Sequence, residues 1–340
     1  MTSRERVRAI IGGQPTDRIG FWLGCPLPDT WPRLHQYFGT QSEEALRVKL
    51  QDDFRWVSPQ WFPGIYRHPD GLNMFEESVK KTVHGAAGPF ADCEDPAEVE
   101  DHEWPNPDDL FFDDYIESLR HVGPYYRASG FWTCFYHNVM DLFGMDNYMV
   151  KMYEAPEVVH AVTDKVCGFY YEANRRLFER TGGLIDGFFF GNDFGTQLDL
   201  ICGPAQFDEF IMPWFRKFTA LAHSYGYQVI LHSCGAVHRV VERLIDAGVD
   251  CLHPLQALAQ NMDAETLARD FKGRIAFLGG IDTQQLLDHG TPEEVKADVR
   301  RVKALLGPRL IVSPSHEAIL PNVPPENVAA LAEAAIEAQG

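Results

Sequence analysis

Residues 228–253 read QVILHSCGAVHRVVERLIDAGVDCLH. An apolar run ends at His232, an amphipathic helical pattern follows, and a second apolar run ends at His253. Short buried strands that alternate with helices of about 10–15 residues are typical of βα units, whose strands form a parallel sheet. This stretch therefore predicts one strand–helix–strand unit of a parallel α/β fold.

The same alternation extends through the chain. The clearest strand-like runs are Ile185–Gly191, Gln228–His232, Gly248–His253, Arg274–Gly279 and Arg309–Val312, and three more are expected at Ile19–Leu23, Asp53–Val57 and Phe131–Tyr136. Eight strands in series favour a closed barrel, and no strand precedes the Gly-x-Gly-x-x-Gly pattern of open dinucleotide-binding sheets. We therefore predict a single-domain (β/α)8 TIM barrel over residues 1–340.

Helix starts support this reading. Thr2 and Glu5 stand at the spacing of a capping box, and Asp263 precedes a helical pattern. Thr291 is followed by a proline at the first helical position and by Glu294 at the third. We expect a helix to begin at each of these places.

The segment 64–114 is irregular, rich in Asp, Glu and Pro, and too long for a simple connection. One interpretation is a surface excursion with a hairpin at Met74–Lys81 and Thr82–Phe90. The other is a lid or a loop that contacts a second copy in a homodimer. We favour the surface excursion.

The composition excludes several classes of protein. The chain has 340 residues with 30 basic and 49 acidic side chains, a net charge of −19. Such a field disfavours nucleic acid and anionic membranes as partners. No run approaches the roughly 20 apolar residues of a membrane span, and the N-terminus lacks the build of a signal peptide. The seven scattered cysteines are typical of a reducing compartment, so we expect a cytoplasmic protein.

Polar residues gather where a barrel places its chemistry. Active sites of such barrels lie at the carboxyl ends of the strands. The residues expected at those ends are Asp193, His232, Cys234, His253, Gln256, Asp282, Ser315, His316 and Glu317.

His232 and Cys234 form the sharpest pattern. Residues two apart on a strand point to the same side, so the imidazole and the thiolate could converge on one metal ion. Zinc accepts this pair of ligands, and a catalytic zinc site has three protein ligands and an open position. A third ligand would come from His316, Glu317 or His253. The alternative is a buried cysteine beside a hydrogen-bonded histidine.

Asp193 follows a strand directly and could position a substrate or move a proton, although a turn aspartate is the alternative. His316 and Glu317 are candidates for ligands or acid–base groups. The aromatic residues near the early strand ends either line a flat apolar pocket or belong to the core; they are Trp22, Trp56, Trp61, Phe131, Trp132 and Tyr136. The candidate substrate contacts are Trp22, Tyr136, Asn138, Gln197, His253, Gln256 and Asp282.

Four segments in a fixed order resemble the uroporphyrinogen decarboxylase superfamily. They are GNDFGTQ at 191–197, LHSCG at 231–235, FLGGIDTQ at 277–284, and PSH at 314–316 leading to VPPENV at 323–328. The resemblance covers roughly residues 115–340. It implies a (β/α)8 barrel with a deep cleft and one of two chemistries: metal-free decarboxylation of porphyrinogens, or zinc-dependent methyl transfer involving corrinoid proteins.

The resemblance favours the second chemistry. The decarboxylases carry an arginine-containing motif after the first strand, whereas this chain has no arginine from Gly24 to Pro32. His232-x-Cys234 resembles the methyltransferases, but Ser315-His316-Glu317 stands where thiol-methylating members supply a second cysteine. This departure suits a zinc ion that polarises a leaving group as a Lewis acid.

We therefore expect a zinc-dependent methyltransferase that demethylates a small methoxylated or N-methylated compound. His232, Cys234 and His316 or Glu317 would hold Zn²⁺, and Asp193 would act on substrate. No corrinoid-binding Asp-x-His-x-x-Gly motif is present, so a corrinoid would come on a partner protein. The alternatives are a metal-free decarboxylase or lyase, and a barrel that binds a ligand without turnover.

Overall fold

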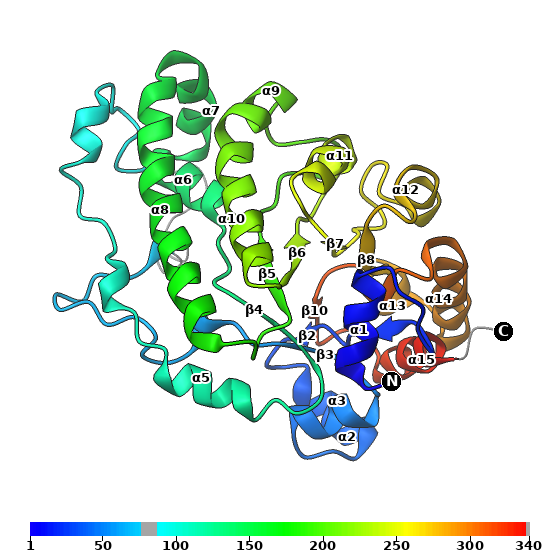
Figure 1. Ribbon diagram of the computed structural model, residues 1–340. Coiled ribbons are helices and arrows are strands. Elements are labelled where there is room, and N and C mark those ends of the chain that lie inside the picture. The colour runs from blue at the N-terminus through cyan, green and yellow to red at the C-terminus, as the bar shows by residue number, and fades with distance from the viewer. Residues whose placement is uncertain (76–86, 338–340) are drawn as a thin grey trace.

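The computed structural model describes residues 1–75 and 87–337 (Figure 1). Its main sheet has eight strands, all parallel, in the order β1-β9-β8-β7-β6-β5-β4-β3. The strands are β1 (Gly20–Phe21), β3 (Phe54–Trp56), β4 (Tyr126–Ser129), β5 (Gly187–Gly191), β6 (Gln228–His232), β7 (Cys251–His253), β8 (Ala276–Ile281) and β9 (Leu310–Pro314). The predicted (β/α)8 barrel is confirmed.

The two end strands of this order, β1 and β3, are joined mainly through one aspartate. The amide of Asp53 donates to the carbonyl of Phe21 at 2.9 Å. In return, the amide of Phe21 donates to the Asp53 carboxylate at 3.1 Å. The side chain thus replaces part of a strand ladder and closes the barrel at this seam.

The barrel interior is a packed apolar core. Helix α1 (Ser3–Ile11) places Val7, Ile10 and Ile11 in the same cluster as Trp22 and other inward-pointing strand residues. Figure 1 shows α1 lying next to the strands close to the N-terminus. This filling leaves the opposite, carboxyl end of the strands free for a site.

Helices surround the sheet, and the longest is α8. They are α2 (Trp31–Phe38), α3 (Glu43–Lys49), α5 (Asp113–Arg120), α6 (Phe135–Phe143), α7 (Met145–Glu154), α8 (Pro156–Thr181), α9 (Pro204–Gln206), α10 (Met212–Ser224), α11 (His238–Asp246), α12 (Ala264–Phe271), α13 (Leu286–His289), α14 (Pro292–Leu306) and α15 (Pro325–Ile336), with short η1 (Pro59–Trp61), η2 (Pro96–Val99), η3 (Pro107–Asp109) and the π-helical η4 (Phe207–Ile211). A small second sheet pairs β2 (Cys25–Pro26) with β10 (Ala318–Ile319).

The predicted helix starts are confirmed at α1, α12 and α14. Thr2 and Thr291 each form a reciprocal capping box, and Asp263 accepts a hydrogen bond from the amide of Thr266 at 2.8 Å. Within the described residues, no helix is both long enough and apolar enough to cross a membrane.

The strand predicted at Phe131–Tyr136 is wrong. The strand lies earlier, at Tyr126–Ser129, and Gly130 ends it with a φ of +104°. Phe131 then donates its amide to the side chain of Asn174 at 2.9 Å, and α6 begins at Phe135. The aromatic run suggested a strand because it is apolar, but Phe131, Phe135 and Tyr136 belong to the large outer core cluster, and Trp132 packs against the barrel interior.

The described parts of the irregular segment 64–114 pack on α8. η2 and η3 both lie against α8, and Phe75 contacts Phe169 of that helix with ring centroids 5.5 Å apart. Its ends are joined where Tyr66 bridges Leu110. Most of the hairpin expected at Met74–Lys81 and Thr82–Phe90 lies outside the described residues.

Candidate metal site

Strand register brings the predicted site residues together. Gly191 of β5 pairs with His232 of β6, and His232 pairs with His253 of β7. Asp193 and Cys234 each stand two residues beyond their paired positions, at the carboxyl end of the barrel. Glu317 joins them from the loop between β9 and β10.

His232 lies at the centre of this cluster and is buried. Its Nε2 faces Cys234 Sγ at 3.3 Å and Asp193 Oδ1 at 3.3 Å. Its Nδ1 faces His253 Nδ1 at 3.0 Å and Glu317 Oε2 at 3.4 Å. One imidazole therefore connects two sets of polar groups, one on each ring nitrogen.

Each set has the composition of a metal site. The ligand atoms of Asp193, His232 and Cys234 lie within 4.8 Å of one another, and so do those of His232, His253 and Glu317. Nitrogen, thiolate sulfur and carboxylate oxygen are the ligands that zinc uses in proteins. Among the described residues of the cluster, His253 Nε2 and Glu317 Oε2 are buried and make no hydrogen bond. Both atoms are therefore available to bind a metal ion. These residues fit a zinc ion.

The loop after β6 is held in place by glycine and by side-chain acceptors. Gly235 has a φ of +86°, and a Cβ there would collide with the carbonyl of Gly195. The amide of Cys234 donates to Asp193 Oδ1 at 2.8 Å, and that of Gly235 donates to Gln256 Oε1 at 2.7 Å. These bonds fix the thiol beside His232.

Electrostatics in the cluster favour the ligating forms of the acidic groups. Burial by itself would raise the pKa of the Cys234 thiol, but hydrogen bonding with His232 and His316 lowers it below its ordinary value. Burial likewise opposes ionisation of Asp193, yet hydrogen bonds with His232 and with the Cys234 amide bring its pKa down. A thiolate and a carboxylate are the forms that bind metals.

The two buried histidines respond in opposite directions. Burial alone would lower the pKa of His232, but the charge of Glu317 and the bonds with Asp193 and Cys234 raise it well above its ordinary value. Burial lowers the pKa of His253 well below its ordinary value, and the positive charge of His232 adds to this effect. The cluster thus draws positive charge to its centre, where a divalent cation would sit.

His316 lies at the open side of the cluster, with 45% of its side chain exposed. A hydrogen bond with Cys234 raises the pKa of His316 above its ordinary value. Its Nδ1 accepts from the amide of Ala318 at 3.1 Å, which leaves Nε2 as the nitrogen without this backbone bond. The structure therefore brings the predicted ligands His232 and Cys234 together, but Asp193 takes the third place, because the ligand atoms within 4.8 Å of one another are those of Asp193, His232 and Cys234. The His316 ring lies nearby, 6.2 Å from that of His232, and its role as a ligand stays a prediction.

Three predicted substrate contacts are corrected. Trp22 is fully buried in the barrel interior, where its ring lies 5.3 Å from that of His253, so it supports the site from below. Tyr136 and Asn138 are also buried, on α6. Asn138 accepts a hydrogen bond from Tyr170, and the Tyr136 ring packs on Phe194. A ligand at the barrel mouth would not touch these three side chains.

Gln197 and Gln256 occupy the loops around the cluster. Gln197 is exposed and its carbonyl accepts from the amide of Gln260 at 3.0 Å, which ties two neighbouring loops together. Gln256 is partly buried and orients the Gly235 amide. Both positions remain predictions for substrate contact.

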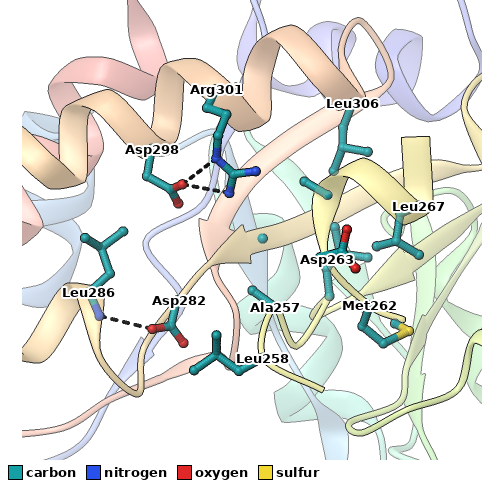
Figure 2. A pocket seen from close by; sticks show the side chains of 13 residues that line it. Ala257, Leu258, Met262, Asp263, Leu267, Asp282, Leu286, Asp298, Arg301 and Leu306 are labelled. Carbon is teal, nitrogen blue, oxygen red and sulfur yellow. Dashed lines mark hydrogen bonds and ion pairs between the residues drawn. The ribbon is translucent and has the colours of Figure 1, made fainter. Parts of the chain in front are cut away.

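Asp282 caps a turn at the end of β8, and its predicted contact with substrate stays a prediction. Its carboxylate accepts from the amides of Gln284, Gln285 and Leu286 at 2.8–3.1 Å, and so caps the turn that leads into α13. It lines a cavity of about 310 Å³ between α12, α14 and the loop after β7. Figure 2 shows the Asp282 carboxylate directed to the Leu286 amide, with Arg301 paired to Asp298 across the cavity.

Trp132, which was expected either to line an apolar pocket or to belong to the core, lies against the cluster. The ring of Trp132 lies 5.1 Å from that of His232, in the space left by Gly191, where a Cβ would collide with the indole. A glycine at the last position of a buried strand is a signal for such a close approach, but only the structure shows which residue makes it.

The arginines nearest the N-terminus lie at the other end of the barrel. Arg6 and Arg18 pair with the buried Asp53, and Arg4 and Arg8 pair with the buried Asp186, at 2.7–2.9 Å. Asp186 immediately precedes β5, at the end of the strand opposite to Gly191. Arg4, Arg6 and Arg8 thus attach α1 to the barrel, Arg18 attaches the segment before β1, and none of the four faces the cluster.

Comparison with known proteins agrees with this architecture. A family model described as "Uroporphyrinogen decarboxylase (URO-D)" matches residues 88–338. Among solved structures, a methyltransferase from Methanosarcina mazei superposes with a TM-score of 0.66 at 17% identity, over 98% of each chain. No curated protein matches. The match to the family model covers most of the chain, and the protein belongs to the uroporphyrinogen decarboxylase family.

Proposed function

We propose that this chain is a zinc-dependent methyltransferase that moves a methyl group between a small methylated or methoxylated compound and a corrinoid carried by a partner protein. The observation that carries the proposal is the convergence of Asp193, His232 and Cys234, whose ligand atoms lie within 4.8 Å of one another at the mouth of the barrel. The fold shared with a methyltransferase is consistent with it.

His232 Nε2, Cys234 Sγ and Asp193 would hold the ion, with His316 at the open side. Zinc would supply Lewis acidity toward the atom that loses the methyl group. Glu317 and His253 lie at the other nitrogen of His232 and would fix the direction in which that ring points. This role differs from the ligand or acid–base role predicted for Glu317 from sequence.

His316 is the group placed to manage a proton. It is the most exposed histidine of the cluster, and its interaction with Cys234 favours its protonated form. A methyl ether that loses its methyl group leaves an oxygen that must gain a proton. His316 would donate that proton, since Asp193 is held as a carboxylate.

The competing function is metal-free decarboxylation, which the family's description favours. That chemistry would use Asp193 and needs cations to hold the carboxylates of the substrate. Arg4, Arg6, Arg8 and Arg18 are instead engaged at the far end of the barrel. The geometry therefore supports the metal-dependent function better.

Metal analysis tests the proposal. We expect about one zinc per chain in freshly purified protein, and loss of that zinc in Cys234→Ser with the fold intact by circular dichroism. Cys251→Ala is the matched control, because Cys251 is buried in the barrel interior and outside the cluster. Methyl transfer to chemically reduced cobalamin, followed by its absorbance, should require zinc. A chain without metal that shows decarboxylase activity would establish the metal-free decarboxylase instead, if that activity survives chelators and is lost in Asp193→Asn.

A further inference from the structure

Three tryptophans form a row from the solvent to the candidate metal site. Trp61 is 58% exposed, and its ring centroid lies 4.6 Å from that of Trp56. Trp56 lies 4.9 Å from Trp132, and Trp132 lies 5.1 Å from His232. We call Trp56, Trp61 and Trp132 the tryptophan row.

The fold holds this row in place. Trp61 ends η1, and Gln60 of the same turn accepts a hydrogen bond from the amide of Trp132 at 2.5 Å. Gly191 leaves the space that the Trp132 ring fills beside His232. Trp56 and Trp132 pack on the barrel core with one side, and both remain partly exposed. An exposed tryptophan that continues such a fixed aromatic surface is typical of a binding site.

The charges around the row restrict its ligand. In the part of the chain that the structure describes, the arginines and lysine that lie over rings cover Trp31, Phe111, Tyr125 and Trp214, and none covers the row. Beyond Trp132, the carboxylates of Asp193 and Glu317 lie 3.3 Å and 3.4 Å from the ring nitrogens of His232, so acidic and basic groups balance one another there. The row itself is an apolar surface that carries no charge, which suits a neutral ring better than an ionised group.

We propose that the tryptophan row binds the aromatic ring of a neutral aryl methyl ether, with the methoxy group toward His232. This proposal rests on the proposed function for its choice of leaving atom. A Lewis acid needs a lone pair on that atom, which an ether oxygen offers and a quaternary ammonium does not. The preference for an aromatic over an aliphatic ring, in contrast, depends only on the tryptophans.

Calorimetric titration of the purified protein with anisole and with methoxycyclohexane tests the proposal. Methoxycyclohexane has the same heavy atoms as anisole but no aromatic ring. We expect anisole to bind roughly threefold to tenfold more tightly. Trp61→Ala should remove that preference, and Trp61→Phe should restore part of it. Tyr153→Ala is the control, because Tyr153 is an exposed ring on α7, away from the row.

Equal affinities for the two ethers, or an unchanged preference in Trp61→Ala, would overturn the proposal. Tighter binding of tetramethylammonium than of anisole would also overturn it, because the row would then be a cation site. The titrations are repeated on chelator-treated protein. A ring preference that persists without zinc supports the aromatic site, because that preference depends only on the tryptophans. The zinc-dependent function fails separately if the freshly purified chain holds no zinc, so the two failures can be distinguished.

Discussion

At the scale of single residues, His232 shows how a site is built around one imidazole. Its Nδ1 lies 3.4 Å from Glu317, and its Nε2 faces the thiol of Cys234. A carboxylate on the far nitrogen of a metal-binding histidine fixes its tautomer and raises its basicity. Under the proposed function, Glu317 would therefore act on the metal through His232.

Replacing this carboxylate should weaken the metal site without removing it. Glu317→Gln keeps the size of the side chain but lowers its ability to accept from His232, and we expect zinc affinity to fall by about 10–100-fold. Competition with a chelator of known affinity measures the change. Glu326→Gln, an exposed glutamate in the first turn of α15, should leave the affinity unaltered. Complete loss of zinc would identify Glu317 as a ligand.

The residues of the site were predictable to different degrees. His232, Cys234 and Asp193 could be found from sequence because each stands at or two positions beyond a strand end, where the fold dictates direction. Trp22 and Asn138 could not be excluded, since a short strand or an early helical turn does not reveal which way a side chain points. Trp132 needed the structure, because its position depends on the turn at Gly130 and on Gln60.

At the scale of elements, the strands and their flanking helices were predicted correctly, except for the strand expected at Phe131–Tyr136. β6 was predicted at its observed bounds because three apolar residues stand between two polar ones, Gln228 and His232. β4 has the sequence YRAS, with an arginine and a serine among four residues. It is buried by neighbouring strands rather than by its own apolarity, so the aromatic run after it gave a stronger but misleading signal.

The loop between β6 and α11 should be sensitive to a side chain added at Gly235. Gly235→Ala should lower the free energy of unfolding and reduce zinc binding, because the new Cβ would meet the carbonyl of Gly195 and move Cys234. Gly226→Ala is a matched control, since it also has a positive φ, +75°, but open space around its Cβ. The control should cost about 1 kcal/mol of backbone strain and leave zinc bound. Chemical denaturation and metal analysis of both variants measure the difference, and equal effects would contradict it.

At the scale of the whole molecule, the barrel divides its tasks between its two ends. The carboxyl ends of the strands carry His232, Cys234 and the tryptophan row, whereas the other end is filled by α1. Buried carboxylates hold that helix: Asp53 pairs with Arg6, and Asp186 pairs with Arg4 and Arg8. A charge pattern alone did not predict this arrangement, because the partners lie up to 182 positions apart in the chain.

The stability of the whole barrel should therefore depend strongly on the single charge of Asp53 at the seam between β1 and β3. Asp53 is fully buried, bonds to the amide of Phe21 and pairs with Arg6 and Arg18 at 2.7 Å. Asp53→Asn leaves these cations without their buried counter-charge, and we expect a loss of about 3–5 kcal/mol in the free energy of unfolding. Asp17→Asn removes the half-exposed partner of the same Arg6 and should cost about 1 kcal/mol or less. Urea denaturation of both variants decides the matter: similar losses would mean that the seam is held by the strand packing and not by Asp53.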